Sequence, residues 1–364
     1  MGTPCDSPRR SRRQRRLYFA ADCPKRSGLH LGGPLNPAPG IAIVGCGRIG
    51  EKRAAALANA RLVACADAVP ARAIELAAKN PGATAVACWE DVIVRPDVDV
   101  VLVATTNDWL TPVSVAAVKA GKHVLVEKPG ARTVAELDQL IDAARQHDRR
   151  VRVGFNHRYH PALREARALV DAGELGPLMF VRGRYGHGGR VGYEREWRAD
   201  PEKAGGGELI DQGVHLIDLA SWLLGGPFTE VHGIATTYFW DMPVDDNAFL
   251  TLRTSGGQTA FLHVSCTEWK NLFSLEIYGR QGKISIDGLG GSYGIERLTH
   301  YRMLPQMGPP ETTVREYPGH DVSWSLEFAE LLEDVRVGRE PSAGLGAARA
   351  ALSVTEEVYQ GRKT

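Results

Sequence analysis

The stretch IAIVGCGRIG, residues 41–50, decides the fold of this chain. Its apolar, β-branched first half predicts a strand, its glycines predict a tight turn, and the residues that follow predict a helix. A strand–turn–helix unit with G-x-G-x-x-G spacing presents backbone N–H groups and the positive end of a helix dipole to a pyrophosphate. We therefore predict a dinucleotide site whose cofactor contacts include Gly45, Gly47, Arg48, Ile49 and Gly50.

Asp67 follows the next predicted strand, residues 62–66. It lies about 20 residues beyond the glycines, where a carboxylate holds the ribose hydroxyls of the adenosine half. Because a carboxylate at that place disfavours a 2′-phosphate, the expected cofactor is NAD, with NADP less favoured. The alternative is an ordinary tight strand–helix turn followed by a surface aspartate.

The composition is that of an ordinary globular protein. With 364 residues the chain has room for two domains with sizeable cores, and its formal net charge is only +1. Nothing in this balance indicates nucleic acid or a membrane as a partner. The six cysteines form no C-x-x-C pair and no cysteine–histidine cluster with ligand spacing, which indicates a reduced, cytoplasmic compartment and no structural metal.

Residues 1–38 differ from the rest, with arginines concentrated at 8–16 and glycine and proline frequent further on. A secretory signal would need an apolar stretch of about seven or more residues, and the stretch at 17–21 is too short. We expect a disordered tail or a start upstream of the true first residue. A nucleic-acid-binding arm is the alternative.

Strand and helix patterns alternate between residues 41 and 154, which predicts a parallel, doubly wound sheet. Its expected helices are 70–78, 111–120 and 134–147. Further on, alternating strands are expected at 178–184, 230–237, 248–253, 259–265 and 274–278, a loop at 303–310, and helices at 324–337 and 346–359. We predict the α/β class, with a Rossmann domain at 39–158 and a substrate-binding and oligomerisation domain at 159–364 built on a mostly antiparallel open sheet.

Lys128, in the tripeptide EKP at 127–129, follows the strand expected at 123–126. It therefore lies at the carboxyl edge of the parallel sheet, where such sheets bind ligands. A lysine there can lower the pKa of a substrate hydroxyl or hydrogen-bond a developing alkoxide. The alternative is a solvated lysine in a loop.

The segment GGGELIDQGVHLID, residues 205–218, predicts a mostly apolar, buried helix that continues to about residue 224. Asp211, His215 and Asp218 stand at i, i+4 and i+7, which predicts a polar stripe on one face. A histidine with a carboxylate one turn away is suited to proton transfer, because the carboxylate fixes its tautomer and supports its charged form. The alternatives are a core histidine and an Asp218 that only tethers the helix.

Amide, basic and phenolic side chains gather at the expected domain junction, residues 154–161. Asn156, Arg158 and Tyr159 suit a polyhydroxyl ligand and are predicted to bind substrate. Simple hydrogen bonding between the domains is the alternative for each of them.

Together, the glycine turn, the EKP tripeptide, G-x-N-x-R-Y at 154–159 and the motif at 205–218 resemble the Gfo/Idh/MocA oxidoreductase family from residue 41 to the C-terminus. The resemblance implies a Rossmann domain followed by an α/β domain whose open sheet often forms the subunit interface. A homodimer or homotetramer is therefore expected. It also implies a nicotinamide cofactor and hydride transfer at a carbinol of a sugar or cyclitol.

By the same resemblance, Lys128 contacts the reacting hydroxyl, His215 moves its proton, and Asp211 binds substrate and orients the site. Further cofactor contacts are assigned to Thr105, Asn107, Glu127 and Lys128, and the Trp197-Arg198 pair resembles a family pattern near the cofactor. The chain departs from the family after residue 104, where TTNDWL replaces T-P-N-x-x-H. Asn107 remains, but the proline and the final histidine of the family pattern are absent.

The predicted function is NAD-dependent oxidation or reduction at a secondary alcohol or ketone of a sugar, cyclitol or nucleotide-linked sugar. Residues 182–198 are expected to form the substrate wall. One alternative is a sugar–sugar oxidoreductase with a tightly bound cofactor. The other is a non-catalytic protein that senses NAD or sugar.

Overall fold

A computed structural model describes residues 38–361, so the expectation for the N-terminal tail lies almost entirely outside the described residues. The first sheet is parallel, with strand order β3-β2-β1-β4-β5-β6. Its strands are β1 (Gly40–Val44), β2 (Arg61–Ala66), β3 (Thr84–Ala85), β4 (Val100–Val103), β5 (His123–Val126) and β6 (Val151–Val153). Successive strands are added on one side of β1 up to β3 and on its other side from β4 onward, and the crevice beyond the carboxyl ends of β1 and β4 is where such sheets bind ligands.

Helices cover both faces of this sheet, because its strands are apolar on both sides. The helices between its strands are α1 (Arg48–Ala55), α2 (Pro70–Lys79), α3 (Trp89–Ile93), α4 (Asn107–Lys119) and α5 (Val134–Gln146). The start expected for α4 was four residues too late. Thr106 is its N-cap residue, and Asn107 is already helical.

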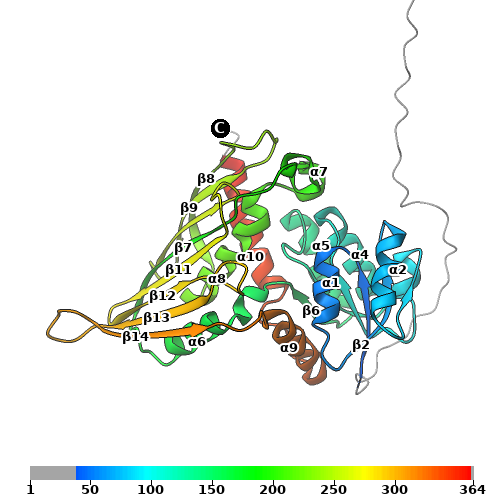
Figure 1. The fold of residues 1–364 in the computed structure, drawn as a ribbon, viewed down its shortest axis with the longest axis horizontal. Coiled ribbons are helices and arrows are strands. Elements are labelled where there is room, and N and C mark those ends of the chain that lie inside the picture. Colours follow the sequence, from blue (N-terminus) through cyan, green and yellow to red (C-terminus); the bar gives the residue numbers. More distant parts are fainter. Residues whose placement is uncertain (1–37, 362–364) are drawn as a thin grey trace, which may run out of the picture.

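The second sheet has eight strands in the order β14-β13-β12-β11-β7-β10-β9-β8, and only the β7–β10 pair is parallel. Its strands are β7 (Leu178–Gly186), β8 (Phe228–Thr236), β9 (Asn247–Thr254), β10 (Thr259–Ser265), β11 (Leu272–Gly279), β12 (Gly282–Asp287), β13 (Glu296–Arg302) and β14 (Glu311–Tyr317). One face packs against α6 (Pro161–Asp171), α8 (Val214–Leu224) and α10 (Leu345–Gly361) (Figure 1). The predicted α/β class with a mostly antiparallel second sheet is confirmed.

The five strands expected in the second half are present, and the loop expected at 303–310 joins β13 to β14. Strands β12, β13 and β14 were not predicted. β14 lies at the edge of the sheet and is exposed along almost its whole length, so no burial selects apolar residues at alternate positions.

Helix α9 (Ser323–Val337) packs against the first sheet although it follows the second in sequence. Its Phe328 and Leu331 join the core cluster that contains Ile43 and Leu102. The domain limits of 39–158 and 159–364 stay a prediction, with α9 extending from the second unit onto the first.

Candidate active site

The glycine turn between β1 and α1 has the shape that a dinucleotide needs. Gly45 has φ +96°, and a Cβ there would lie 2.4 Å from the Ala104 carbonyl oxygen. A Cβ on Gly50 would lie 2.1 Å from the Gly45 carbonyl oxygen, so this glycine permits close helix–strand packing. Gly47 instead faces open space, which leaves its backbone accessible to a pyrophosphate. Arg48 and Ile49 begin α1, and Arg48 is exposed.

Asp67 lies where the adenosine ribose is expected. One carboxylate oxygen accepts a hydrogen bond from the Cys46 N–H (2.7 Å), and the other accepts from the Val69 N–H (2.7 Å). The carboxylate is therefore held against the glycine turn at the end of β2. The Arg72 guanidinium lies 3.9 Å away and is largely exposed. These residues fit a bound dinucleotide.

Lys128 and Asp211 meet at the edge of the first sheet. The Lys128 ammonium donates to the Asp211 carboxylate (2.5 Å) and also to the Asp211 backbone carbonyl. The other carboxylate oxygen accepts from Arg198 Nε (3.0 Å). Burial alone would raise the pKa of Asp211, but the two cations hold it well below its usual range. Asp211 is therefore ionised and orients both cations.

The backbone around Asp211 is wider than a regular helix. Residues Leu209–Gly213 form a π-helical turn that continues directly into α8. Such turns are frequent at functional sites. The two aspartates of the predicted polar stripe bind different partners. Asp211 binds Lys128 and Arg198, while Asp218 binds Arg158.

His215 lies one turn further along, stacked on His157 with ring centroids 3.7 Å apart. Burial first, and then the nearby Lys128 charge, lower the pKa of His215 well below its ordinary value. Its Nδ1 has no hydrogen-bond partner among residues 38–361, so the expected carboxylate that would support a charged imidazole is not seen. The ring is neutral near pH 7 and able to accept a proton.

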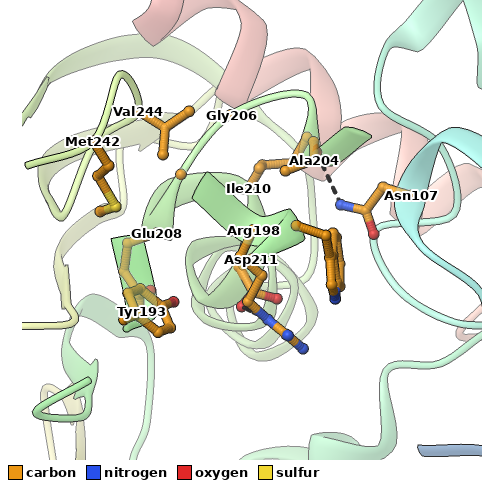
Figure 2. Close-up of a pocket in the computed structure, with 12 residues that line it drawn as sticks. Asn107, Tyr193, Arg198, Ala204, Gly206, Glu208, Ile210, Asp211, Met242 and Val244 are labelled. Carbon is orange, nitrogen blue, oxygen red and sulfur yellow. Dashed lines mark hydrogen bonds and ion pairs between the residues drawn. The ribbon is translucent and has the colours of Figure 1, made fainter. Parts of the chain in front are cut away.

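A small pocket of about 10 Å³, roughly the space of one water molecule, lies beside Asp211 (Figure 2). Asn107 closes one side and donates a hydrogen bond from Nδ2 to the Ala204 carbonyl (2.9 Å), which links α4 to the short helix α7 (Pro201–Ala204). The other lining residues are Tyr193, Trp197, Arg198, Gly206, Gly207, Glu208, Ile210, Met242 and Val244. Thr105 lies in the preceding turn, against Gly45.

Three residues predicted to contact ligands bind other protein groups instead. Glu127 is buried and accepts from Arg53 Nε (2.7 Å), which occupies the carboxylate expected at the cofactor. Arg158 forms a two-pronged ion pair with Asp218, and the Tyr159 hydroxyl accepts from Arg152. A buried charge needs a partner, and these partners satisfy the requirement. For Arg158 and Tyr159 the structure favours the alternative of interdomain bonding.

Asn156 is also buried, and its Nδ2 donates to Ser323 Oγ (2.9 Å) at the start of α9. Its Oδ1 faces His157 Nδ1 at 3.2 Å, so it contributes to the histidine stack rather than to the pocket lining. The sequence analysis included Tyr193 only as part of the substrate wall expected at residues 182–198. It did not predict that Glu208, Met242 and Val244 would line the pocket. Glu208 stands inside a quoted motif, and a charge in that buried run was the available signal.

The described residues, 38–361, contain neither a metal-ligand cluster nor a helix able to span a membrane. These residues include no group of three or more histidine, cysteine, aspartate or glutamate side chains placed to hold a metal ion. Within the same range, no helix combines the length and apolarity needed to cross a membrane.

The strand order, the glycine turn and the polar cluster at the crevice define a nicotinamide-nucleotide-dependent oxidoreductase. Residues 40–155 match the family model described as an oxidoreductase family with an NAD-binding Rossmann fold. Residues 163–285 match the GFO/IDH/MocA C-terminal domain. The chain therefore belongs to the Gfo/Idh/MocA oxidoreductase family, as its motifs predicted, and NAD is its cofactor.

Several relatives have been named. Levoglucosan dehydrogenase of Pseudarthrobacter phenanthrenivorans is 28% identical over 254 residues, 60% of this chain and 63% of that enzyme. The chain thus spans just under two thirds of that relative. The scyllo-inositol 2-dehydrogenase (NAD(+)) of Bacillus subtilis is 27% identical over 318 residues, 82% of this chain and 87% of that one.

Solved structures share the fold. Levoglucosan dehydrogenase in complex with NADH and levoglucosan has a TM-score of 0.80 at 23% identity, covering 89% of this chain and 97% of that one. Aldose–aldose oxidoreductase from Caulobacter crescentus, complexed with glycerol, has a TM-score of 0.78 at 28% identity, covering 90% and 98%.

Proposed function

We propose that this oxidoreductase acts on a secondary alcohol of a sugar or cyclitol, with Lys128, Asp211 and His215 as its catalytic residues. The observation that carries the proposal is the ion-paired Lys128 beside a neutral, buried His215 at the crevice of the first sheet. The named relatives, which include sugar and inositol dehydrogenases, support this substrate class.

In the oxidative direction, bound NAD supplies the acceptor for the carbinol hydride. Lys128 hydrogen-bonds the reacting oxygen and stabilises the negative charge that develops on it. His215, held neutral by burial, accepts the hydroxyl proton. Asp211 orients the Lys128 ammonium group through a hydrogen bond to its carboxylate. In the reductive direction, protonated His215 returns the proton to the oxygen while Lys128 hydrogen-bonds that oxygen.

The sugar–sugar alternative keeps one supporting observation, the 28% identity to an aldose–aldose oxidoreductase. An enzyme of that kind would retain its nucleotide through gel filtration and transfer hydride between two sugars without added NAD. A freely exchanging dehydrogenase would lose the nucleotide and need added NAD for each turnover.

We also propose a homodimer or homotetramer formed through the open face of the second sheet. That face exposes Phe249 on β9 and Phe261 on β10, which are more apolar than a solvated surface requires. Light scattering after gel filtration measures the mass of the assembly. A monomer at micromolar concentration would contradict this proposal.

The cytoplasmic location of the protein also stays a prediction.

The function is tested with a panel of inositols, hexoses and nucleotide sugars, with NAD and NADP compared, read at the absorbance of reduced nicotinamide. Lys128→Met and His215→Asn should each lower kcat by about 10²-fold or more while NADH binding, followed by fluorescence, stays within about threefold. Lys79→Met, on the exposed side of α2, is the matched control and should leave turnover unchanged. Unaltered turnover in either catalytic variant would refute the assignment.

A further inference from the structure

Glu208 is a buried carboxyl group without a partner. It is 2% exposed, and neither carboxyl oxygen has a hydrogen-bond partner among residues 38–361. The residue lines the pocket beside Asp211, three positions earlier in the chain. Buried polar groups in native proteins are nearly always hydrogen-bonded, so an orphaned one in a ligand pocket requires an explanation.

His187 faces the same carboxyl group. The Gly189 N–H donates to His187 Nδ1 (2.9 Å), so in the neutral ring the proton resides on Nε2. Nε2 lies 3.7 Å from Glu208 Oε1, which is too long for a hydrogen bond. Tyr193 is another residue that lines this pocket. The groups around Glu208 approach it without satisfying it.

The surroundings favour the neutral form of Glu208. Burial, and then the nearby carboxylates of Asp211 and Asp245, raise its pKa well above the ordinary value. Asp211 takes the hydrogen bonds of both neighbouring cations, Lys128 and Arg198. A neutral carboxyl offers one O–H donor and one carbonyl acceptor, the complement of an alcohol hydroxyl.

We propose that Glu208 is a specificity-determining residue that hydrogen-bonds a second hydroxyl of the substrate while Lys128 and His215 act on the first. This inference rests on the proposed function. A polyol gives the Glu208 carboxyl the partner that the protein does not give it. An alcohol with a single hydroxyl leaves it buried and unpaired, so the site discriminates against such compounds.

The test compares Glu208→Gln and Glu208→Leu with Glu202→Gln, an exposed control on α7. Substrates are myo-inositol and D-glucose, with cyclohexanol as the single-hydroxyl probe. Glutamine keeps one donor and one acceptor, so we expect the KM for the polyols to stay within about threefold of the parent. Leucine offers neither, and we expect their KM to rise about tenfold or more, with a smaller change in kcat.

Two further measurements separate a binding role from a structural one. Because the side chain has no hydrogen-bond partner in the described part of the chain, Glu208→Leu should unfold at the same temperature or higher and keep NADH affinity. Its turnover of cyclohexanol should not fall below that of the parent. A clear drop in melting temperature for both variants would make Glu208 structural and overturn the inference.

The remaining outcomes are also decisive. If the parent enzyme turns over the polyols and Glu208→Leu has the same KM, the inference fails and the proposed function stands. If the parent turns over no inositol, hexose or nucleotide sugar of the panel, both fail. A strong preference for D-glucosamine over D-glucose that Glu208→Gln abolishes would show an ionised carboxylate pairing with an ammonium group, which overturns the neutral hydroxyl site.

Discussion

At the scale of single residues, Lys128 shows how neighbours prepare a group for its reaction. An ammonium group has three N–H donors. Two of them are directed to Asp211, one to its carboxylate and one to its backbone carbonyl, which fixes the direction of the third. The third donor is therefore oriented before substrate arrives, and little conformational freedom remains to be lost in the transition state.

Asp67→Ser is expected to change the choice between cofactors. The substitution removes a carboxylate from the ribose site while keeping a hydroxyl that can accept from the turn. Losing a charge-assisted hydrogen bond is worth about 1.5–3 kcal/mol, so NADH affinity should fall about tenfold or more. NADPH affinity should fall less or rise, because the repulsion disappears and Arg72 lies close by. Fluorescence titration measures both, and an equal loss for the two nucleotides would contradict this.

The sequence predicted where the candidate catalytic residues lie in the fold better than it predicted their partners. The positions of Lys128 after a strand and of Asp211 and His215 in a helical segment follow from local spacing. The partners do not: Glu127 pairs with Arg53 across 74 residues, and Arg158 pairs with Asp218 across 60. The hydrophobic periodicity of a segment predicts which face of its helix or strand a residue occupies. The partner of a buried charge depends on how distant segments pack in the folded chain, which local periodicity does not predict.

At the scale of elements, two glycines of the turn before α1 have different roles: Gly50 permits close helix–strand packing, and Gly47 leaves space for the cofactor. Gly50→Ala places a Cβ against the Gly45 carbonyl, so we expect a loss of about 1–3 kcal/mol in the free energy of unfolding. Gly47→Ala meets open space and should cost about 1 kcal/mol or less. It should nevertheless weaken NADH binding about tenfold, because the methyl group occupies the approach of the pyrophosphate. Urea unfolding and fluorescence titration measure the two effects, and a Gly47 variant with intact binding would refute the assignment.

The histidine stack between the segment 156–159 and α8 should make stability depend on pH. Burial lowers the pKa of both His157 and His215 well below 6.5, so the unfolded chain binds more protons than the folded one just below that pH. Stability is therefore full above pH 6.5 and falls below it, by up to about 1.4 kcal/mol per pH unit for each ring.

His157→Phe keeps an aromatic ring in the stack and removes one titrating group. Its free energy of unfolding should fall less between pH 6.5 and 5.5 than that of the parent, by about 1 kcal/mol. His320→Gln, at an exposed position, is the control and should follow the parent. Urea unfolding at pH 7.5, 6.5 and 5.5 measures the difference, and parallel curves for His157→Phe and the parent would contradict the prediction.

At the scale of the whole molecule, α9 joins the two halves beneath the site. Arg53 of α1 binds Glu127, next to Lys128, and also Glu327 of α9. Two turns on, Asp334 of α9 binds Arg152 of β6. Buried ion pairs therefore join helix α9 to α1, through Arg53 to the segment that follows β5, and to β6.

Arg53→Met tests whether this network holds the architecture together. The substitution leaves Glu127 and Glu327 buried without their shared cation, and such a loss costs about 3–5 kcal/mol. Arg297→Met, which breaks an exposed pair with Glu316 on the β13–β14 hairpin, should cost about 1 kcal/mol or less. Urea unfolding measures both. Equal losses in the two variants would mean that the buried network contributes no more than a surface ion pair, and that apolar packing of α9 alone holds the halves together.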